Sequence, residues 1–194
     1  MSIRVEVDGG KSLERAEKLL AGITRGNFTG TRNAAYRALE RAGASAKTEA
    51  GRFAAEEYTI NKGDFTRNVS VTTSVSGGGS THGGEISMSL KFAGTVLPLL
   101  TFNTKYSRDG LLTTQIKRNG GAATLEHAFA ERVFGPIAAF ERVGSPRFPV
   151  EQKFGPSTAH MMQNEQVIEK MDKKIKEEFE KRMEVQITRI MNGW

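Results

Sequence analysis

The sequence contains no cysteine and no long hydrophobic run. Without cysteine the chain can form no disulfide bond, no thiolate metal site and no cysteine nucleophile. The longest apolar stretch, FAGTVLPLL at 92–100, is too short to span a bilayer and is interrupted by proline. The first ten residues, MSIRVEVDGG, lack the apolar region of a secretory signal. We therefore expect a soluble protein that is made in the cytoplasm and has no membrane partner.

Basic residues are in excess, but they form no block. Lysine and arginine outnumber aspartate and glutamate by 28 to 22, and the pI is about 9.6. A surplus of this size is compatible with a position close to a polyanion. Because no basic run or recognition-helix pattern is present, the sequence does not indicate a module that reads bases. A non-specific nucleic-acid-binding domain remains an alternative function.

The first sixty residues are predicted to be mainly helical. The alternation in IRVEV at 3–7 predicts a short strand, and Ser12 is expected to cap a helix whose apolar positions continue to Ile23. From Thr31 to about Tyr58 the chain is rich in alanine and free of proline, which predicts a second, longer helix. Small residues on this helix would let another element approach it closely.

A long hairpin is expected to follow. Residues 69–75 and 86–92 both alternate between apolar and polar, and the segment SGGGSTHGG at 76–84 joins them. So many glycines exceed the needs of a two-residue turn and offer no apolar anchor, so a partner is expected to order this tip. The candidate assembly contacts in the tip are Gly77, Gly78, Gly79 and His82.

Further strands are predicted after residue 110. The segments LLTTQIKR, HAFAERVF, PIAAFERVG and RFPVEQKF are strand-like and separated by turn residues. The overlapping segment ATLEHAFAERVF at 123–134 also fits a short helix, and periodicity does not decide between the two. The expected fold class is α+β in a single domain over 1–194, with a helical part at 1–60, an antiparallel sheet at 61–156 and a long helix at 157–194.

The final helix carries one apolar stripe. Its apolar residues recur every three or four positions between Ile168 and Ile190, and its other face carries acid-to-base pairs four residues apart. Either the helix lies across its own sheet, or it packs against a neighbouring subunit. In the second case the assembly contacts would be Ile168, Met171, Ile175 and Phe179.

No catalytic, cofactor or metal constellation is predicted. VDGGKS at 7–12 imitates a phosphate-binding loop, but Val5 stands where the first glycine is required, so we interpret the segment as a helix start. The histidines His82, His127 and His160 lack the spacing of metal ligands. Ser157 and His160 are close enough to touch and leave a small hydrolase as a weaker alternative. No nucleophile elbow surrounds Ser157, which is explained more simply as a helix N-cap.

The C-terminal third resembles the prophage minor tail protein Z family. In that family a strand ending in F-x-R precedes a short basic turn and then LPI-x-x-x-x-GPS, which leads into a terminal helix. This chain has GPIAAFERVGSPRFPVEQKFGPSTAHMM followed by a charged helical segment, and the resemblance covers about 127–194. The positions that match the family's pattern are Phe140, Arg142, Arg147, Phe148, Pro149, Val150, Gly155, Pro156 and Ser157.

The resemblance implies a structural virion protein of a long-tailed phage or prophage and no enzyme. Such a protein is synthesised in the bacterial cytoplasm and becomes part of the tail, as a component of the neck at its head-proximal end. It would act in tail completion and head–tail joining, as a homo-oligomeric ring of six-fold symmetry that contacts tail terminator, tail tube and neck proteins. If the ring surrounds the path of the DNA, the candidate DNA-facing residues are Lys105, Arg108, Lys117 and Arg118.

Overall fold

The computed structural model describes residues 2–8, 14, 18, 29–76, 87–109, 111–132 and 135–192. The chain forms two compact units, and each is assembled from separate segments of the sequence. We call residues 2–50, 71–92 and 168–194 the helical unit, and residues 51–70 and 93–167 the strand-rich unit. These units differ from the consecutive parts 1–60, 61–156 and 157–194 that the sequence suggested.

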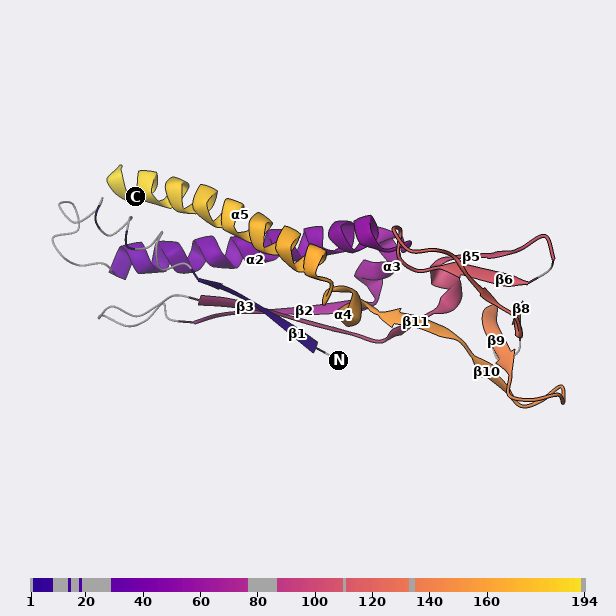
Figure 1. Cartoon of the computed structure of the whole chain (residues 1–194). Helices are drawn as coiled ribbons and strands as arrows, with labels where there is room; N and C mark the ends of the chain where they lie inside the picture. Colours follow the sequence, from indigo (N-terminus) through magenta and orange to yellow (C-terminus); the bar gives the residue numbers. More distant parts are fainter. Residues whose placement is uncertain are drawn as a thin grey trace. The chain divides into compact units, whose positions relative to one another are not determined.

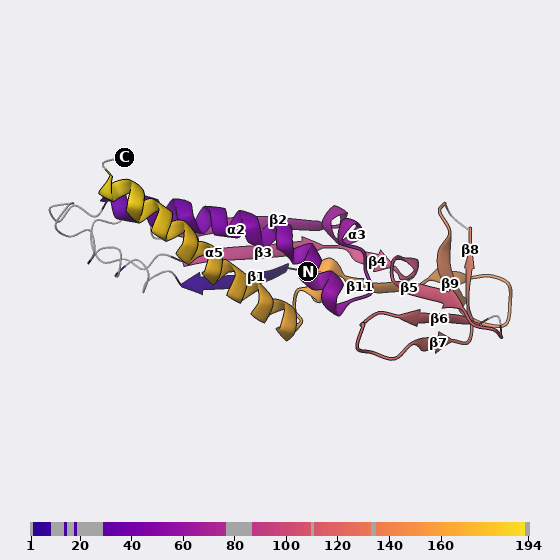
Figure 2. The ribbon, with the colours of Figure 1, turned by 90° about the horizontal axis from the view of Figure 1, so that it is seen from above.

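The helical unit combines one sheet with two long helices. Its strands are β1 (Ser2–Asp8), β2 (Val69–Ser76) and β3 (Ser87–Gly94), in the order β1-β3-β2. Within this unit, α2 (Thr29–Glu57) and α5 (Glu165–Met191) lie on the same side of the sheet (Figures 1 and 2). The strand at 3–7, the alanine-rich helix and the two hairpin strands are therefore confirmed.

Helix α2 packs closely because its buried face is built from small residues. Ala35, Ala38 and Ala42 are fully buried. A Cβ atom added to Gly43 would lie 2.9 Å from Sδ of Met88 and 2.9 Å from Cγ2 of Thr73. Since carbon atoms do not approach so closely, glycine at position 43 is what brings this part of α2 against β2 and β3.

Helix α5 buries its apolar stripe within its own chain. The side chains of Met171, Ile175, Phe179 and Met183 are at most 3% exposed. The stripe ends at Gln186, a polar residue that is also buried. The other predicted stripe residues are only half-buried, and they are Ile168, Ile187 and Ile190.

The strand-rich unit contains three small antiparallel sheets and two short helices. Strands β5 (Asn103–Tyr106), β6 (Leu112–Gln115) and β7 (Ala123–Leu125) form one sheet. A second has the order β10-β9-β8, from β8 (Ala128–Glu131), β9 (Ala138–Arg142) and β10 (Val150–Gln152). The third pairs β4 (Val96–Pro98) with β11 (Phe154–Ser157). The remaining elements are α3 (Lys62–Arg67), the 3-10 helix η1 (Leu99–Thr101) and α4 (Thr158–Met161).

A compact apolar cluster holds these short strands together. Leu99, Leu112, Ala128 and Ala139 are all at most 8% exposed and pack together, so the cluster joins η1, β6, β8 and β9. Hydrogen bonds add to this apolar contact. The hydroxyl oxygen of Tyr106 in β5 accepts a hydrogen bond from the backbone N–H of Ala130 in β8 at 2.9 Å.

The fold class is α+β, as predicted, but two details differ. The helical alternative for 123–134 is wrong, because Ala128 to Glu131 pair with β9 as a strand. A single helix over 157–194 is also wrong. Helix α4 ends at Met161 and α5 begins at Glu165, where Asn164 Oδ1 accepts a hydrogen bond from the Gln166 backbone N–H at 3.0 Å. Asn164 therefore acts as a second N-cap.

Two predicted segments lie outside the described residues. The first helix, from Ser12 to Ile23, is described only at Glu14 and Lys18. The glycine-rich tip of the hairpin lies wholly outside them, with its candidate contacts Gly77, Gly78, Gly79 and His82. Gly9 to Ser12 of the phosphate-loop-like segment are also outside the described part.

Candidate functional site

The described residues form no hydrolase-like or metal-binding constellation around the predicted serine and histidines. Ser157 is buried, and its Oγ accepts a hydrogen bond from the backbone N–H of His160 at 3.1 Å. This bond is that of an N-cap and does not use the imidazole ring. His127 and His160 are both exposed. Within the described ranges, no three potential metal ligands of the His, Cys, Asp or Glu type lie together.

The four candidate DNA-facing cations are in different surroundings. Lys105 and Arg108 are exposed at the end of β5 and in the turn after it, and Lys117 is exposed after β6. Arg118 is already used within the fold. Its Nε donates a hydrogen bond to the backbone oxygen of Ala55 at 2.6 Å, and its backbone N–H donates to the oxygen of Glu57 at 2.9 Å.

Arg118 thereby satisfies carbonyl groups at the C-terminal end of α2, where the helix leaves them without partners. A guanidinium also has a favourable charge at this end of the helix dipole. We therefore assign Arg118 a structural role in the strand-rich unit and keep only the other three cations as candidates for DNA contact.

Most exposed apolar side chains belong to the strand-rich unit. Eight large apolar residues of the described part are exposed, and only Val185 and Met191 are in the helical unit. Those of the strand-rich unit are Val96, Tyr106, Ile137, Val143, Phe148 and Phe154. Single exposed apolar residues are common on protein surfaces. Several of them in neighbouring elements are less common and can mark an interaction surface.

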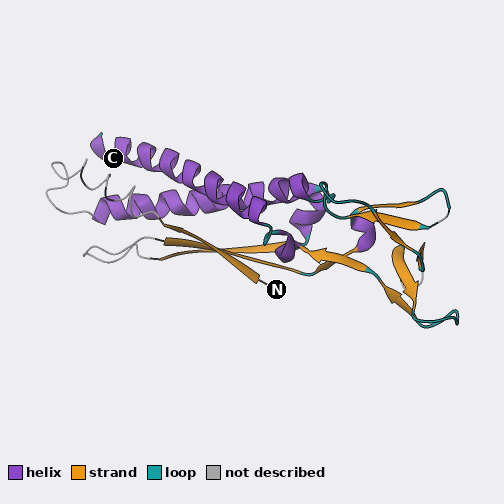
Figure 3. Ribbon diagram, in the orientation of Figure 1, coloured by secondary structure: helices purple, strands orange, loops and turns teal. Residues whose placement is uncertain are grey.

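Three of them flank or belong to the loop that connects β9 to β10. Ile137 precedes β9 and is 59% exposed, while Val143 and Phe148 lie in the loop itself and are each 58% exposed. The loop projects beyond the ends of its two strands within this unit (Figure 3). We call Ile137, Arg142, Val143, Arg147 and Phe148 the hairpin surface.

Arginines lie over the aromatic rings of this region. The guanidinium carbon of Arg142 is 5.4 Å from the centre of the Phe129 ring, and that of Arg147 is 5.8 Å from the centre of the Phe148 ring. Both distances are within the range of a cation–π interaction. Stacking keeps the two charges close to the apolar side chains, so the hairpin surface is both apolar and cationic.

The strands beneath the hairpin surface hold its loop in place. Val150, Glu151 and Gln152 pair with Arg142, Glu141 and Phe140, and the backbone N–H of Val143 donates to the oxygen of Pro149 at 3.2 Å. Phe140 is 3% exposed, and its ring centre is 6.2 Å from that of Phe129. The peptide bond between Phe148 and Pro149 is cis.

A salt bridge between Lys153 and Glu141 joins the chain after β10 to β9. The hydrogen bond to Glu141 raises the pKa of the Lys153 ammonium above its usual value. A lysine whose pKa is raised by folding stabilises the folded state at every pH below the ordinary lysine pKa. This contribution is lost only when the pH rises through the raised pKa of the folded protein. The ion pair is therefore formed throughout neutral pH.

A cleft of about 680 Å³ opens beside the hairpin surface. Arg142 and Val143 of that surface line it, together with the edge of β8 at Ala128 and Phe129 and the preceding residue His127. The cleft has the volume of a small-molecule site, but the described residues that line it contain no group of metal ligands.

Comparisons of this chain with protein-family models, with curated proteins and with solved structures find no match. In the described part of the chain, no helix combines the length and the apolar character that crossing a membrane requires.

Of the family-like residues, Arg142 is the last residue of β9, Arg147 and Phe148 lie in the loop that follows, and all three are exposed. Pro149 and Val150 follow in the same hairpin, whereas Ser157 caps α4. Sequence reasoning did not single out Ile137 and Val143. The available signal was the segment VGSPRFP at 143–149, in which apolar residues lie inside a turn-rich stretch.

Proposed function

We propose that this chain is a structural virion protein of a long-tailed phage or prophage, acting at the head-proximal end of the tail in tail completion and head–tail joining. The observation that carries the proposal is the hairpin surface. Arg142, Arg147 and Phe148, which match the pattern of the minor tail protein Z family, are exposed at the end of β9 and in the loop after it, where Arg147 lies over the ring of Phe148.

The composition of the hairpin surface favours a protein partner. Protein–protein interfaces are enriched in aromatic residues and arginine, and a few such residues supply most of the binding energy. The guanidinium carbon of Arg147 is 5.8 Å from the centre of the Phe148 ring, and both side chains are exposed, so both are accessible to a partner.

Open strand edges provide a second means of assembly. In the described sheet β10-β9-β8, the strands β10 and β8 each have one neighbour, and the same holds for β5 and β7 in their sheet. An unpaired edge can accept a strand from another chain through backbone hydrogen bonds. A head-to-tail contact between different surfaces of identical subunits closes into a ring when the rotation fits, and six-fold symmetry is our proposal for this chain.

The buried residues of α5 do not serve as ring contacts in this proposal. Met171, Ile175 and Phe179 are covered by their own chain, so they act by holding α5 in place. The proposed outside partners are tail terminator, tail tube and neck proteins, and the contact begins at the hairpin surface. The exposed cations Lys105, Arg108 and Lys117 are proposed to face the DNA path as delocalised charge without base reading.

A genetic test addresses this function directly. Deleting the coding sequence from the phage or prophage that carries it should leave filled heads and tails that do not join, as seen by electron microscopy. Supplying the full chain should restore complete particles. Supplying a Val143→Ser and Phe148→Ser double variant should not, while a Val185→Ser variant, altered at an exposed apolar site of the helical unit, should restore them. Complete infectious particles in the absence of the chain would refute the proposal.

A further inference from the structure

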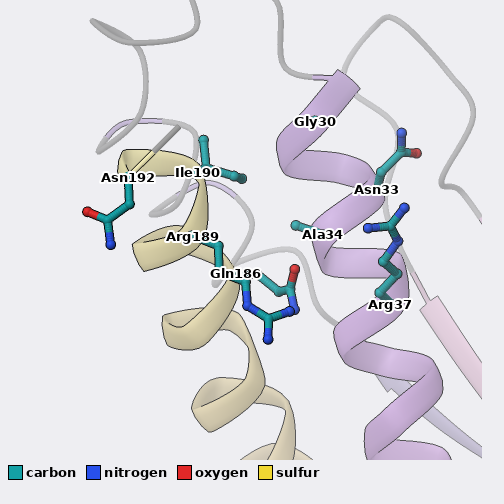
Figure 4. Close-up of a pocket in the computed structure, with 8 residues that line it drawn as sticks. All are labelled: Gly30, Asn33, Ala34, Arg37, Gln186, Arg189, Ile190 and Asn192. Atoms are coloured by element: carbon teal, nitrogen blue, oxygen red, sulfur yellow. The ribbon is translucent and has the colours of Figure 1, made fainter. Parts of the chain in front are cut away.

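A groove of about 670 Å³ lies in the helical unit between the first turns of α2 and the last turns of α5 (Figure 4). Its polar lining consists of Asn33 and Arg37 from α2 and of Gln186, Arg189 and Asn192 from α5 and its end. The volume is within the range of small-ligand sites. None of the described residues that line this groove carries a carboxylate.

The two arginines of the groove are uncompensated in the described part of the chain. Neither Arg37 nor Arg189 makes a side-chain hydrogen bond or ion pair with another described residue. For Arg189 the sequence gives the reason. The positions three and four residues away on the helix hold Val185, Gln186, Asn192 and Gly193, and none of them is acidic.

Gln186 supplies a second and independent observation. It is only 7% exposed, and its amide has no hydrogen-bond partner among the described residues. The amide atoms of Gln186 are not among the fully buried unpaired atoms of the described residues, so the small exposed part of this side chain leaves its amide open to the groove. Gln186 also occupies the end of the stripe in which Ile175, Phe179 and Met183 are apolar. An apolar side chain would have fitted this position without leaving a polar group unpaired.

The amide of Gln186 points into the groove. Figure 4 shows the Gln186 amide next to the side chain of Arg189 in the space between the two helices, on the side that faces α2. Asn33 and Arg37 lie one turn apart on α2, and in this view their side chains are on the side of α2 away from α5, whereas Ala34 points toward α5. Arg37 and Arg189 are both exposed, and the groove is lined by residues of both helices, so a ligand in it would meet hydrogen-bond donors from both.

We propose that this groove binds a phosphate group, held by the guanidinium groups of Arg37 and Arg189 and by the side-chain amide of Gln186. Arginine is suited to phosphate because its planar fork of N–H donors matches two phosphate oxygens. The groove also lies at the first turns of α2, at Gly30, where the positive end of the helix dipole favours an anion. The inference does not depend on the proposed role in tail assembly.

A phosphate group reaches such a groove either as a free anion or as part of a nucleic-acid backbone. Both share the chemistry that the groove recognises, and the experiment separates them. Inorganic phosphate and a twelve-nucleotide single-stranded DNA of random sequence are titrated separately into the purified full chain by isothermal calorimetry, at constant ionic strength. Tighter binding of the oligonucleotide, in competition with phosphate, identifies the backbone as the ligand. Binding of phosphate alone identifies the free anion.

Three variants and one matched control test the assignment. Arg37→Gln and Arg189→Gln should each weaken phosphate binding by about tenfold or more, because a charge-assisted hydrogen bond is lost. Arg41→Gln is the control, since Arg41 is an exposed arginine of α2 that does not line the groove. It should change the affinity by less than about twofold, the effect of a distant screened charge.

The Gln186→Leu variant separates a ligand-binding role from a structural one. Without phosphate it should be at least as stable as the wild type, because a largely buried side chain that makes no hydrogen bond to the described residues is replaced by an apolar one of similar size. It should nevertheless bind phosphate more weakly. The proposal is overturned if neither phosphate nor the oligonucleotide binds, if Arg41→Gln loses as much affinity as the groove variants, or if Gln186→Leu binds phosphate as the wild type does.

Discussion

The hydroxyl group of Thr158, the first residue of α4, donates a hydrogen bond to the backbone oxygen of Asn68 at 2.9 Å. Gly94, the last residue of β3, lies against both partners. A Cβ atom at this position would be 1.8 Å from Oγ1 of Thr158 and 2.7 Å from the oxygen of Asn68. The bond therefore links two distant parts of the sequence in the strand-rich unit, and glycine at position 94 lets a third part pack against it.

Replacing Gly94 by alanine should destabilise the protein. The added methyl group has to displace either a backbone oxygen or the Thr158 hydroxyl, and overpacking of this kind costs about 1–3 kcal/mol. The matched control is Gly63→Ala in α3, where a Cβ atom has nothing within 4 Å. This control should lose no stability, because alanine is the better helix former. Urea unfolding followed by circular dichroism measures both. Equal stability of the two variants would show that the Thr158–Asn68 contact is not required.

Truncating Ile175 tests whether α5 packs into the core of its own chain. Ile175 is fully buried in the apolar stripe, so Ile175→Ala should cost about 2–5 kcal/mol through lost burial and the remaining cavity. Val185 is 42% exposed on the same helix, and Val185→Ala should stay within about 0.5 kcal/mol of the wild type. The free energy of unfolding from urea titration gives both values. A small effect of Ile175→Ala would mean that a neighbouring subunit is needed to cover the stripe.

Arg118 should matter for stability and not for DNA binding. Arg118→Met removes the hydrogen bond to Ala55 and should cost about 1 kcal/mol, the usual net value of one such bond. Lys117→Met, at the neighbouring exposed position, should leave stability unchanged. Thermal unfolding of the two variants gives the comparison, and filter binding with plasmid DNA gives the second readout. A loss of DNA binding confined to Arg118→Met would contradict the assignment.

We expect Ser157 and His160 to contribute to stability and not to catalysis. Ser157→Ala removes the N-cap of α4 and should lower the free energy of unfolding by about 1 kcal/mol. Ser157→Thr keeps a hydroxyl acceptor and should lose less. His160→Ala should be nearly neutral, because only the backbone N–H of residue 160 makes the bond. An ester-hydrolysing activity that both alanine variants abolish, with the fold retained, would restore the hydrolase hypothesis.

Elements with strong local signals could be predicted from the sequence. Helix α2 is a long alanine-rich segment without proline, and β2 and β3 alternate over several residues. The short strands β4, β5 and β11 have little periodicity of their own and form because β4 pairs with β11 and β5 with β6. These strands depend on pairing with other segments of the chain, and a local sequence pattern does not show that pairing.

Neither the break before α5 nor the exposure of the hairpin surface could be predicted from the sequence. The reasons differ. Residues 158–192 contain no proline or glycine that would mark a break in the helix, so only the cap geometry at Asn164 reveals that a new helix begins. Phe148 reads as a core position of an alternating strand, yet it lies exposed in a turn. Whether an apolar residue is buried depends on what the rest of the chain places over it.

The oligomeric state of the purified full chain in solution tests most directly the central claim that this protein assembles into a ring through its hairpin surface. Native mass spectrometry and negative-stain electron microscopy of the wild type at micromolar concentration, alone and with the tail tube protein of the same phage, measure its assembly. We expect a closed ring, with six subunits as the predicted number. The Val143→Ser and Phe148→Ser double variant should remain monomeric, whereas Val185→Ser should assemble. A wild-type chain that stays monomeric under both conditions, or a double variant that still forms the ring, would contradict the account.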